Sequence, residues 1–425
     1  MDSFIINGGP RLRGRATISG SKNASLPIMA ATLLCEGQTV LRGVPELADV
    51  AALIKLLQKL GVSVTRQPDG ALVLQVEDEM DCHANYDLVR RMRASVCVMG
   101  PLLGKRGKAQ VAMPGGCAIG DRPINLHIMG LRQLGAEAEL IGGDVYLRSK
   151  RLTGAEIFLG GPFGSTVTGT ANVMMAATVA RGRTVIEAAA CEPEVVDLAN
   201  FLNKCGARIE GHGTPRITID GVSQLKGCEY QVIPDRIEAG TFMMASAITN
   251  GELRLSNCRL EHMLAVVDRL RAVGVNIEKE DNEVVVSSAR RLEPVEVTTQ
   301  TYPGFPTDLQ AQIMALLCLA DGNSIISERI YPDRFLHVAE LGRMGARLRR
   351  EGPTVMVEGV KRLTGAPVMA SDLRASAALV LAGLIAKGQT RVNRVYHIDR
   401  GYERIDEKLA SIGADIKRVP QSDEE

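Results

Sequence analysis

The chain has 425 residues, of which 50 are basic and 49 acidic, and only 3% are aromatic. Such a balance argues against a nucleic-acid-binding protein, which usually has a basic excess and aromatic side chains for stacking. A hydrophobic content of 45% excludes global disorder, and the length predicts two or three domains. The nine scattered cysteines contain no CxxC pair and indicate reduced thiols in a cytoplasmic protein. The N-terminus lacks a signal-peptide pattern and no apolar run is long enough to span a bilayer, so we expect no membrane partner.

One pattern occurs six times along the chain. Each copy has an apolar, Ala/Met-rich helix that ends at a glycine, a short β-branched run, and a second helix that ends in a hydrophobic residue, Gly, and Ala or Val. The first glycines are Gly37, Gly107, Gly182, Gly251, Gly322 and Gly388, at intervals of 70, 75, 69, 71 and 66. The second are Gly61, Gly135, Gly206, Gly274, Gly345 and Gly413, at intervals of 74, 71, 68, 71 and 68. Two independent markers therefore indicate a repeat of about seventy residues.

The repeats predict an α/β fold of six units in two sets of three. Each second glycine fits a left-handed helix C-cap, and short alternating runs that follow, such as 62–65, are typical of strands. The join falls near Pro234, which gives a predicted domain over 21–231 and another over 1–20 plus 232–425. Residues 1–20 are expected to form strands that complete the sixth unit.

Charged residues recur at similar places in several repeats, at or near predicted helix starts. Helix N-termini attract anions, and arginine binds phosphate or carboxylate through two parallel hydrogen bonds. Any one such arginine is commonly a surface charge, and Asp308 alone fits a helix N-cap. As a set repeated in register, the residues predict an anion-binding cleft: Lys22, Arg93, Arg122, Asp308, Arg374 and Arg400.

The segment 114–123 (PGGCAIGDRP) carries three glycines around Cys117. It belongs to the repeat with the longest spacing between its two glycines, 28 residues against 23 to 25 elsewhere, so we interpret it as a loop inserted over the cleft, typical of a lid. Arg122 nearby favours the thiolate, so Cys117 is predicted to be reactive, whereas a buried inert thiol remains the alternative. His127 fits a ligand contact or a structural residue better than a base for Cys117. No His/Cys/Asp group has metal-ligand spacing.

Six motifs together resemble one family of enzymes. They are SGSKNASLPIMAATLL (19–34), MRAS (92–95), PGGCAIGDRPINLH (114–127), FPTDLQAQ (305–312), SDLRAS (371–376) and IDRGYERI (398–405). Their order and spacing resemble the UDP-N-acetylglucosamine 1-carboxyvinyltransferases over nearly the whole chain. This resemblance implies two inside-out α/β barrels, each of three repeats around a pseudo-threefold axis, with a cleft between them.

The resemblance also implies a reaction. The enolpyruvyl group of phosphoenolpyruvate would move to the 3-hydroxyl of UDP-N-acetylglucosamine, with release of phosphate, as the first committed step of peptidoglycan synthesis. Cys117 would be the acid at C3 and the target of fosfomycin, Asp308 the base, and Lys22 and Arg400 further catalytic residues. Neither a metal nor an organic cofactor is implied, and we expect a monomer or a weak homo-oligomer.

Binding residues are implied in the same way. Phosphoenolpyruvate would contact Lys22, Asn23, Arg122, Arg374 and Arg400, with Asp372 alongside. The sugar nucleotide would contact Arg93, Arg122, Pro123, Ile124, Asn125, Leu126, Asp308 and Ile330, with Ser165, Thr166 and Val167 as further candidates.

The chain departs from the family pattern at Gly164, where a lysine-containing segment is common. Two alternatives stay open. One is a 5-enolpyruvylshikimate-3-phosphate synthase-like transferase, against which the cysteine loop argues. The other is a non-catalytic UDP-sugar-binding relative, against which the joint presence of Lys22, Cys117, Asp308 and Arg400 argues.

Overall fold

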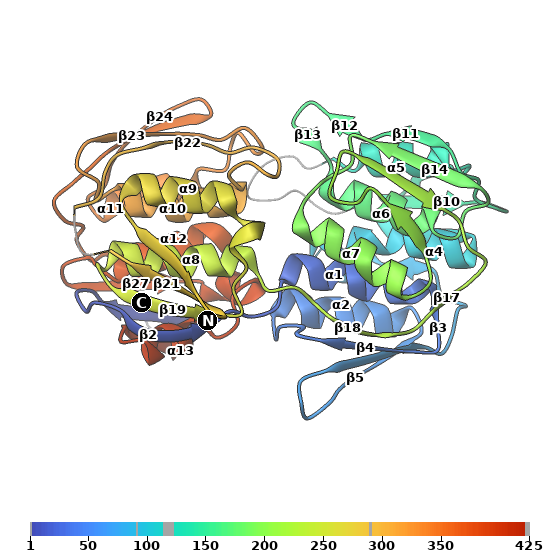
Figure 1. Cartoon of the computed structure of the whole chain (residues 1–425), viewed down its shortest axis with the longest axis horizontal. Helices are drawn as coiled ribbons and strands as arrows, with labels where there is room; N and C mark the ends of the chain where they lie inside the picture. The colour runs from blue at the N-terminus through green and yellow to red at the C-terminus, as the bar shows by residue number, and fades with distance from the viewer. Residues whose placement is uncertain (1, 91, 114–122, 289–290, 421–425) are drawn as a thin grey trace. The chain divides into compact units, whose positions relative to one another are not determined.

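The computed structural model describes residues 2–90, 92–113, 123–288 and 291–420, which form two compact units (Figure 1). The first unit contains the described residues from Gly20 to Ile233, coloured blue to green. The second contains the residues up to Ser19 and those from Pro234 onward, coloured dark blue and yellow to red. Within these described segments, no helix is long and apolar enough to cross a membrane.

The described part of the first unit has three four-stranded sheets of one pattern, ordered β18-β4-β6-β5, β7-β8-β10-β9 and β11-β14-β16-β15. In each sheet the first strand runs parallel to the second, and the other neighbours are antiparallel. The strands are β4 (Gln38–Arg42), β5 (Val62–Arg66), β6 (Leu72–Val76), β7 (His83–Ala84), β8 (Lys108–Ala112), β9 (Glu137–Ile141), β10 (Asp144–Arg148), β11 (Glu156–Phe158), β14 (Arg183–Glu187), β15 (Arg208–Glu210), β16 (Arg216–Asp220) and β18 (Glu229–Gln231). Two short pairs are β3 (Cys35–Glu36) with β17 (Leu225–Lys226), and β12 (Gly160–Gly161) with β13 (Gly164–Ser165).

Helices form the inside of this unit. The first helices of the three repeats are α1, α4 and α6, and they pack together with the 3₁₀ helix η2. In α6 the whole of Gly169–Ala177 is buried. A helix that is apolar on all sides must be enclosed, which places the helices inside the sheets. The helices are α1 (Lys22–Ala31), η1 (Thr32–Leu34), α2 (Ala48–Lys59), α3 (Tyr86–Val89), η2 (Arg93–Val98), α4 (Met99–Arg106), α5 (Asn125–Gln133), α6 (Val167–Ala177) and α7 (Pro193–Lys204).

The second unit repeats this plan in its described residues, with sheets β2-β19-β21-β20, β22-β23-β25-β24 and β26-β27-β1-β28. The strands are β1 (Asp2–Asn7), β2 (Arg13–Thr17), β19 (Glu252–Ser256), β20 (Asn276–Glu280), β21 (Glu283–Ser287), β22 (Glu296–Thr298), β23 (Asn323–Ser327), β24 (Arg347–Glu351), β25 (Thr354–Glu358), β26 (Pro367–Met369), β27 (Gln389–Asn393) and β28 (Asp415–Pro420). The helices are α8 (Arg236–Ile248), η3 (Leu260–His262), α9 (Leu264–Val273), η4 (Thr307–Leu309), α10 (Gln310–Leu317), α11 (Leu336–Arg343), α12 (Leu373–Gly383), η5 (Val395–Arg400) and α13 (Ile405–Ser411). Here α8, α10 and α12 pack against one another at the centre.

The chain closes each unit with strands from distant segments. In the second unit β1 lies between β27 and β28, so the N-terminal residues complete the sheet of the sixth repeat. The next strand, β2, joins the sheet of the fourth repeat beside β19. In the first unit β18, just before the join, pairs with β4 of the first repeat (Figure 1). Both units are therefore inside-out α/β barrels of three repeats.

The predicted helix ends are confirmed. The six glycines that end the second helices all have positive φ, between 82° and 105°. That region is strained for residues with a Cβ, so glycine is favoured at each helix end. The six-fold pattern of helix and glycine in the sequence thus corresponds to six structural repeats.

Candidate functional site

Asp308 is held between two buried arginines of the second unit. It lies in η4, immediately before α10. Its Oδ1 accepts a hydrogen bond from Arg334 Nη1 at 2.8 Å, and its Oδ2 accepts one from Arg374 Nη2 at 2.9 Å. The side chains of the two arginines are only 7% and 3% exposed, whereas that of Asp308 is 27% exposed. The carboxylate therefore reaches solvent while both of its oxygens are occupied by guanidinium groups.

This arrangement fixes the charge of Asp308. Burial raises the pKa of a carboxyl group, but the positive charges of Arg374 and Arg334 outweigh that effect. They hold the pKa of Asp308 well below its usual range, so the group is ionised at neutral pH. The alternative interpretation of Asp308 as a helix N-cap is wrong, because Pro306 occupies that position and no side chain caps η4.

Arg374 is the second residue of α12 and is 2% exposed. The N-cap Asp372 accepts hydrogen bonds from the backbone N–H groups of Arg374 and Ala375, at 2.9 and 3.2 Å. The guanidinium lies 5.4 Å from the ring centroid of Tyr402. Its Nη1 has no hydrogen-bond partner among the described residues. A buried cation with an unused donor is suited to an anionic ligand.

The central helices of the second unit support Arg374 through Tyr402. The Tyr402 hydroxyl lies 2.8 Å from Oγ1 of Thr241 on α8 and accepts a hydrogen bond from Nε2 of Gln312 on α10 at 3.0 Å. Tyr402 itself is 1% exposed. The ring under Arg374 is therefore fixed by two of the three central helices, which limits the positions that the guanidinium can take.

Arg334 is a residue that the sequence analysis did not identify. Besides Asp308 it contacts Thr307, whose Oγ1 accepts from Nη1 at 3.1 Å. One signal was present: Arg334 lies between β23 and α11, the same strand-to-second-helix connection that carries Arg122 in the second repeat and Arg400 in the sixth. That Arg334 shares this connection became visible only once the strands and helices were placed.

The buried carboxylate of Glu328 shapes the turn that carries Ile330. Its Oε1 accepts from Thr299 Oγ1 at 2.7 Å and from the backbone N–H groups of Ile330 and Tyr331 at 2.8 and 2.9 Å. Its Oε2 accepts from Thr307 Oγ1 at 2.9 Å. Glu328 thereby connects the turn at Ile330 to the segment that carries Asp308.

Arg400 is half-buried and is the last residue of η5. It therefore lies near a helix start and not at one, since α13 begins at Ile405. The connection folds into a 3₁₀ helix before α13, which the glycine spacing did not reveal. Burial, and next to it the charge of Arg400, lower the pKa of the neighbouring His397.

Lys22 and Asn23 begin α1 in the first unit. Lys22 is 8% exposed, and its Nζ donates to Oδ2 of Asp49, in the first turn of α2, at 3.1 Å. Asn23 is exposed, and the preceding Ser21 caps the helix by accepting from the Ala24 N–H at 3.3 Å. Arg93 is half-buried at the start of η2. The predicted placement of these residues at helix starts is confirmed.

The cysteine loop lies outside the described residues, so Cys117 and Arg122 remain sequence-based predictions. The residues after it are described: Pro123 and Asn125 are exposed, Ile124 is buried and Leu126 is half-buried at the start of α5.

His127 is a buried residue that connects α5 to α6. Its Nδ1 accepts from Asn172 Nδ2 at 2.9 Å, and its Nε2 lies 3.1 Å from Thr168 Oγ1. An amide nitrogen only donates, so Nδ1 carries no proton and Nε2 donates to the threonine. These contacts fit the structural interpretation of His127.

The segment around Gly164 forms a small hairpin. Ser165 pairs with Gly160 in the β12–β13 strands, and Gly164 has a φ of 98°. Thr166 caps α6 by accepting from the Gly169 N–H at 3.2 Å, and Val167 is exposed. Backbone groups and hydroxyls are thus presented beside a helix N-terminus, which suits an anion even without a lysine.

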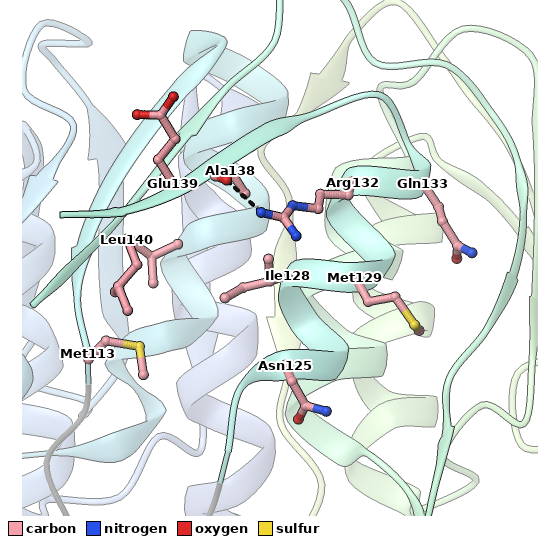
Figure 2. Close-up of a pocket in the computed structure, with 10 residues that line it drawn as sticks. Met113, Asn125, Ile128, Met129, Arg132, Gln133, Ala138, Glu139 and Leu140 are labelled. Atoms are coloured by element: carbon pink, nitrogen blue, oxygen red, sulfur yellow. Dashed lines mark hydrogen bonds between the residues drawn. The ribbon is translucent and has the colours of Figure 1, made fainter.

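A cavity of about 500 Å³ lies beside α5 in the first unit (Figure 2). Ile128 on the helix faces Leu140 and Met113 across it, and Arg132 donates to the Ala138 carbonyl at 2.6 Å. Of the residues predicted to bind substrate, Asn125 is among those that line it. The lining is mainly apolar, so this cavity does not supply the cluster of cations that two anionic substrates require.

The chain matches known proteins along almost its whole length. Residues 6–409 match the family model described as EPSP synthase (3-phosphoshikimate 1-carboxyvinyltransferase). UDP-N-acetylglucosamine 1-carboxyvinyltransferase of Methylacidiphilum infernorum (isolate V4) is 53% identical, with 99% of each chain covered. The protein of that name from Geobacter metallireducens is 52% identical, with 99% of this chain and 100% of the relative covered.

Solved structures agree on the fold. The enolpyruvyl transferase NikO from Streptomyces tendae superposes with a TM-score of 0.90 at 25% identity and covers 99% of both chains. EPSP synthase from Acinetobacter baumannii superposes with a TM-score of 0.75 at 19% identity and covers 99% of this chain and 100% of its own. This chain therefore belongs to the EPSP synthase family of carboxyvinyltransferases, and within it to the group of UDP-N-acetylglucosamine 1-carboxyvinyltransferase relatives.

Proposed function

We propose that this protein transfers the enolpyruvyl group of phosphoenolpyruvate to the 3-hydroxyl of UDP-N-acetylglucosamine and releases phosphate, as the first committed step of peptidoglycan synthesis. Relatives with that name share half of its residues over the full chain. The observation that carries the chemistry is Asp308, an ionised and partly exposed carboxylate beside a buried arginine that has an unused donor. A base next to a cation serves a reaction between a hydroxyl and an anionic enol phosphate.

Asp308 is the base in this scheme, and Arg374 controls its strength. While both carboxylate oxygens are bound to arginines, Asp308 holds a proton poorly and is a weak base. The carboxylate or phosphate of an incoming substrate competes for Arg374, whose Nη1 is unoccupied. As that substrate draws the guanidinium away, the pKa of Asp308 rises toward its ordinary value. Substrate binding would thus strengthen the base at the moment when it is needed.

The reaction balances without a cofactor. The 3-hydroxyl oxygen bonds to C2 of phosphoenolpyruvate, its proton passes to Asp308, and C3 takes a proton from Cys117. The resulting tetrahedral ketal then loses a proton from C3 and expels phosphate, which restores the double bond. Cations stabilise the negative charge that develops on the departing phosphate.

The remaining site residues divide between the two substrates. Lys22, Asn23, Arg122, Arg374 and Arg400 would bind phosphoenolpyruvate, with Asp372 fixing the start of α12 beneath Arg374. Lys22, like Arg374, is paired with a carboxylate in the absence of substrate. The sugar nucleotide would contact Arg93, Arg122, Asp308, Ile330, the segments 123–126 and 165–167, and the cysteine loop.

The setting of the enzyme is part of the proposal. We expect it to act in the cytoplasm on two small-molecule substrates, as a monomer or a weak homo-oligomer. Its nearly balanced charge and low aromatic content give it no feature of a nucleic-acid-binding protein.

The second candidate is transfer to shikimate 3-phosphate, because the matching family model carries the name of that enzyme. Release of inorganic phosphate from phosphoenolpyruvate distinguishes the two, with UDP-N-acetylglucosamine or shikimate 3-phosphate supplied as acceptor. Release with the UDP-sugar alone supports the proposal. Release with shikimate 3-phosphate alone supports the second candidate, and release with neither favours a non-catalytic relative.

A further inference from the structure

Two thiols of the first unit are in direct contact on the segment that leads to the domain join. Cys205 is the C-cap residue of α7, and Cys228 lies between β17 and β18. Their sulfur atoms are 3.4 Å apart. Cys205 is 3% exposed, whereas Cys228 is half-buried, so the pair has one buried and one partly accessible member.

The backbone on both sides of this contact is fixed. The carbonyl of Cys205 accepts from the Lys226 N–H at 2.9 Å. One and two turns back along α7, the Phe201 ring packs edge-on against Tyr230 at 5.5 Å between centroids, and Asp197 Oδ1 accepts from the Tyr230 hydroxyl at 2.7 Å. These contacts come from one face of α7 and hold the segment that carries Cys228 against it, so the two sulfurs stay within reach of each other.

We propose that Cys205 and Cys228 are a modification site, at which hydrogen peroxide converts the two thiols into a reversible disulfide. The partly accessible thiol of Cys228 reacts first. Its sulfur takes one oxygen from the peroxide to become a sulfenic acid, and one water leaves. The sulfur of Cys205 then attacks that of Cys228 and expels the hydroxyl as a second water. Two electrons from two thiols thereby reduce one peroxide to two waters.

The surroundings predict a slow reaction at neutral pH. The hydrogen bond to Cys205 and then burial raise the pKa of the Cys228 thiol. The pKa of Cys205 is also raised: Cys228 acts to lower it, but the contact with Cys35 and burial act in the opposite direction and prevail. Besides the pair itself, the titratable or charged groups that act on it in the described chain are Cys35 and Lys204. Because the thiolate is the reactive form, the rate of oxidation should rise with pH.

The bond would tie the end of α7 to the strand that closes the first sheet. It closes a chain segment that runs from 205 to 228, and a crosslink of this kind stabilises mainly by restricting the unfolded chain. We expect the thermal midpoint of the oxidised protein to rise by about 5 °C or more and to return on reduction. This rise in the thermal midpoint does not depend on whether the protein catalyses the enolpyruvyl transfer proposed above.

The test treats the full chain with hydrogen peroxide at pH 7 and pH 9, blocks the remaining thiols and maps the peptides by mass spectrometry. The test variants are Cys205→Ser and Cys228→Ser, and Cys258→Ser in the second unit is the control. Cys35→Ala shows whether Cys35, which contacts Cys205, takes part in the disulfide. We expect a linked pair of peptides containing Cys205 and Cys228, two hydrogen masses lighter than the sum of the free peptides. It should form about a hundredfold faster at pH 9 than at pH 7, since the thiolate fraction rises about tenfold for each pH unit below the pKa.

Each outcome decides the proposal. A linked pair that persists in Cys35→Ala and Cys258→Ser, disappears in the two serine variants and is reversed by dithiothreitol supports it. A link between Cys35 and Cys205 overturns the assignment of the pair. Irreversible oxidation of Cys228 with Cys205 left free, or no reaction of either thiol at pH 9, overturns the proposal as a whole.

Discussion

Arg374 and Asp308 form an ion pair in which Nη2 lies 2.9 Å from Oδ2, so the proposed base is bound by a proposed substrate-binding cation. The guanidinium is also stacked on Tyr402 and keeps one donor unused. A single group therefore connects the recognition of an anion to the basicity of the carboxylate. Two of the predictions below concern the charge of Asp308.

Asp308→Asn should abolish most turnover while the UDP-sugar still binds. The amide keeps the shape of the side chain but cannot accept a proton, so we expect kcat to fall roughly 10²- to 10⁴-fold. Two buried arginines lose their counter-charge, so the thermal midpoint should also fall. Phosphate release measures turnover, and calorimetric titration with UDP-N-acetylglucosamine measures binding.

The matched control for this variant is Asp333→Asn. Asp333 binds Arg350 at 2.9 Å and is 79% exposed, so the same change of charge occurs there at the surface. Its activity should stay at the wild-type level. Full activity in Asp308→Asn would remove Asp308 from the role of base.

Arg334→Gln should shift the acid limb of the kcat/KM profile to higher pH. Arg334 is one of two cations that lower the pKa of Asp308, so its removal raises that pKa and the carboxyl becomes protonated at a higher pH. The measurement is the pH dependence of phosphate release at low substrate concentration. Arg347→Gln, which removes an exposed partner of Glu358, is the control and should leave the limb in place. A variant profile that coincides with the wild type would show that Arg334 does not tune the base.

His337 should make the protein less stable as the pH decreases below 6.5. It is 1% exposed, its Nε2 has no hydrogen-bond partner among the described residues, and burial lowers its pKa to about 4. Between pH 6.5 and 4, His337 therefore binds a proton in the unfolded chain but stays neutral in the folded chain. The free energy of unfolding decreases as the pH falls through this window. From the difference between these two pKa values, the loss is roughly 3 kcal/mol by pH 4.

Replacement of this histidine tests its share of the acid sensitivity. His337→Gln cannot titrate, so its denaturant-unfolding free energy should fall less steeply between pH 6.5 and 4 than that of the wild type. Parallel curves for the two proteins would mean that other groups cause the loss. Asp308 acts only at lower pH, because its contribution is present above the unfolded pKa near 3.9 and is lost as the pH falls toward its depressed folded value.

Fosfomycin should form one covalent adduct with the protein, on Cys117. The prediction follows from a thiol that lies five residues from Arg122 in a glycine-rich segment. Intact-mass and peptide analysis after incubation with the epoxide and UDP-N-acetylglucosamine locate the adduct, and Cys117→Ser should remain unmodified. An adduct on the half-buried Cys258 instead, or none at all, would contradict the prediction.

Local sequence was sufficient for the repeats. The glycines recur because each second helix ends in a left-handed residue, and the Ala/Met-rich helices are apolar on all sides because they form the centre of a barrel. Both features appear in the sequence as patterns that extend over a few neighbouring residues. The helix-start positions of Lys22, Arg93 and Arg374 follow from the same local periodicity.

The tertiary structure decided which side chains meet. Asp308 is 26 residues from Arg334 and 66 from Arg374, and both pairs form because η4, α12 and the connection before α11 come together in the second unit. Cys205 and Cys228 meet because β18 returns to the first sheet. The sequence by itself thus determined the repeated helices and strands, since turn residues and hydrophobic periodicity act over a few residues. The partners of the buried charges and thiols depend instead on how distant segments pack, which no local pattern encodes.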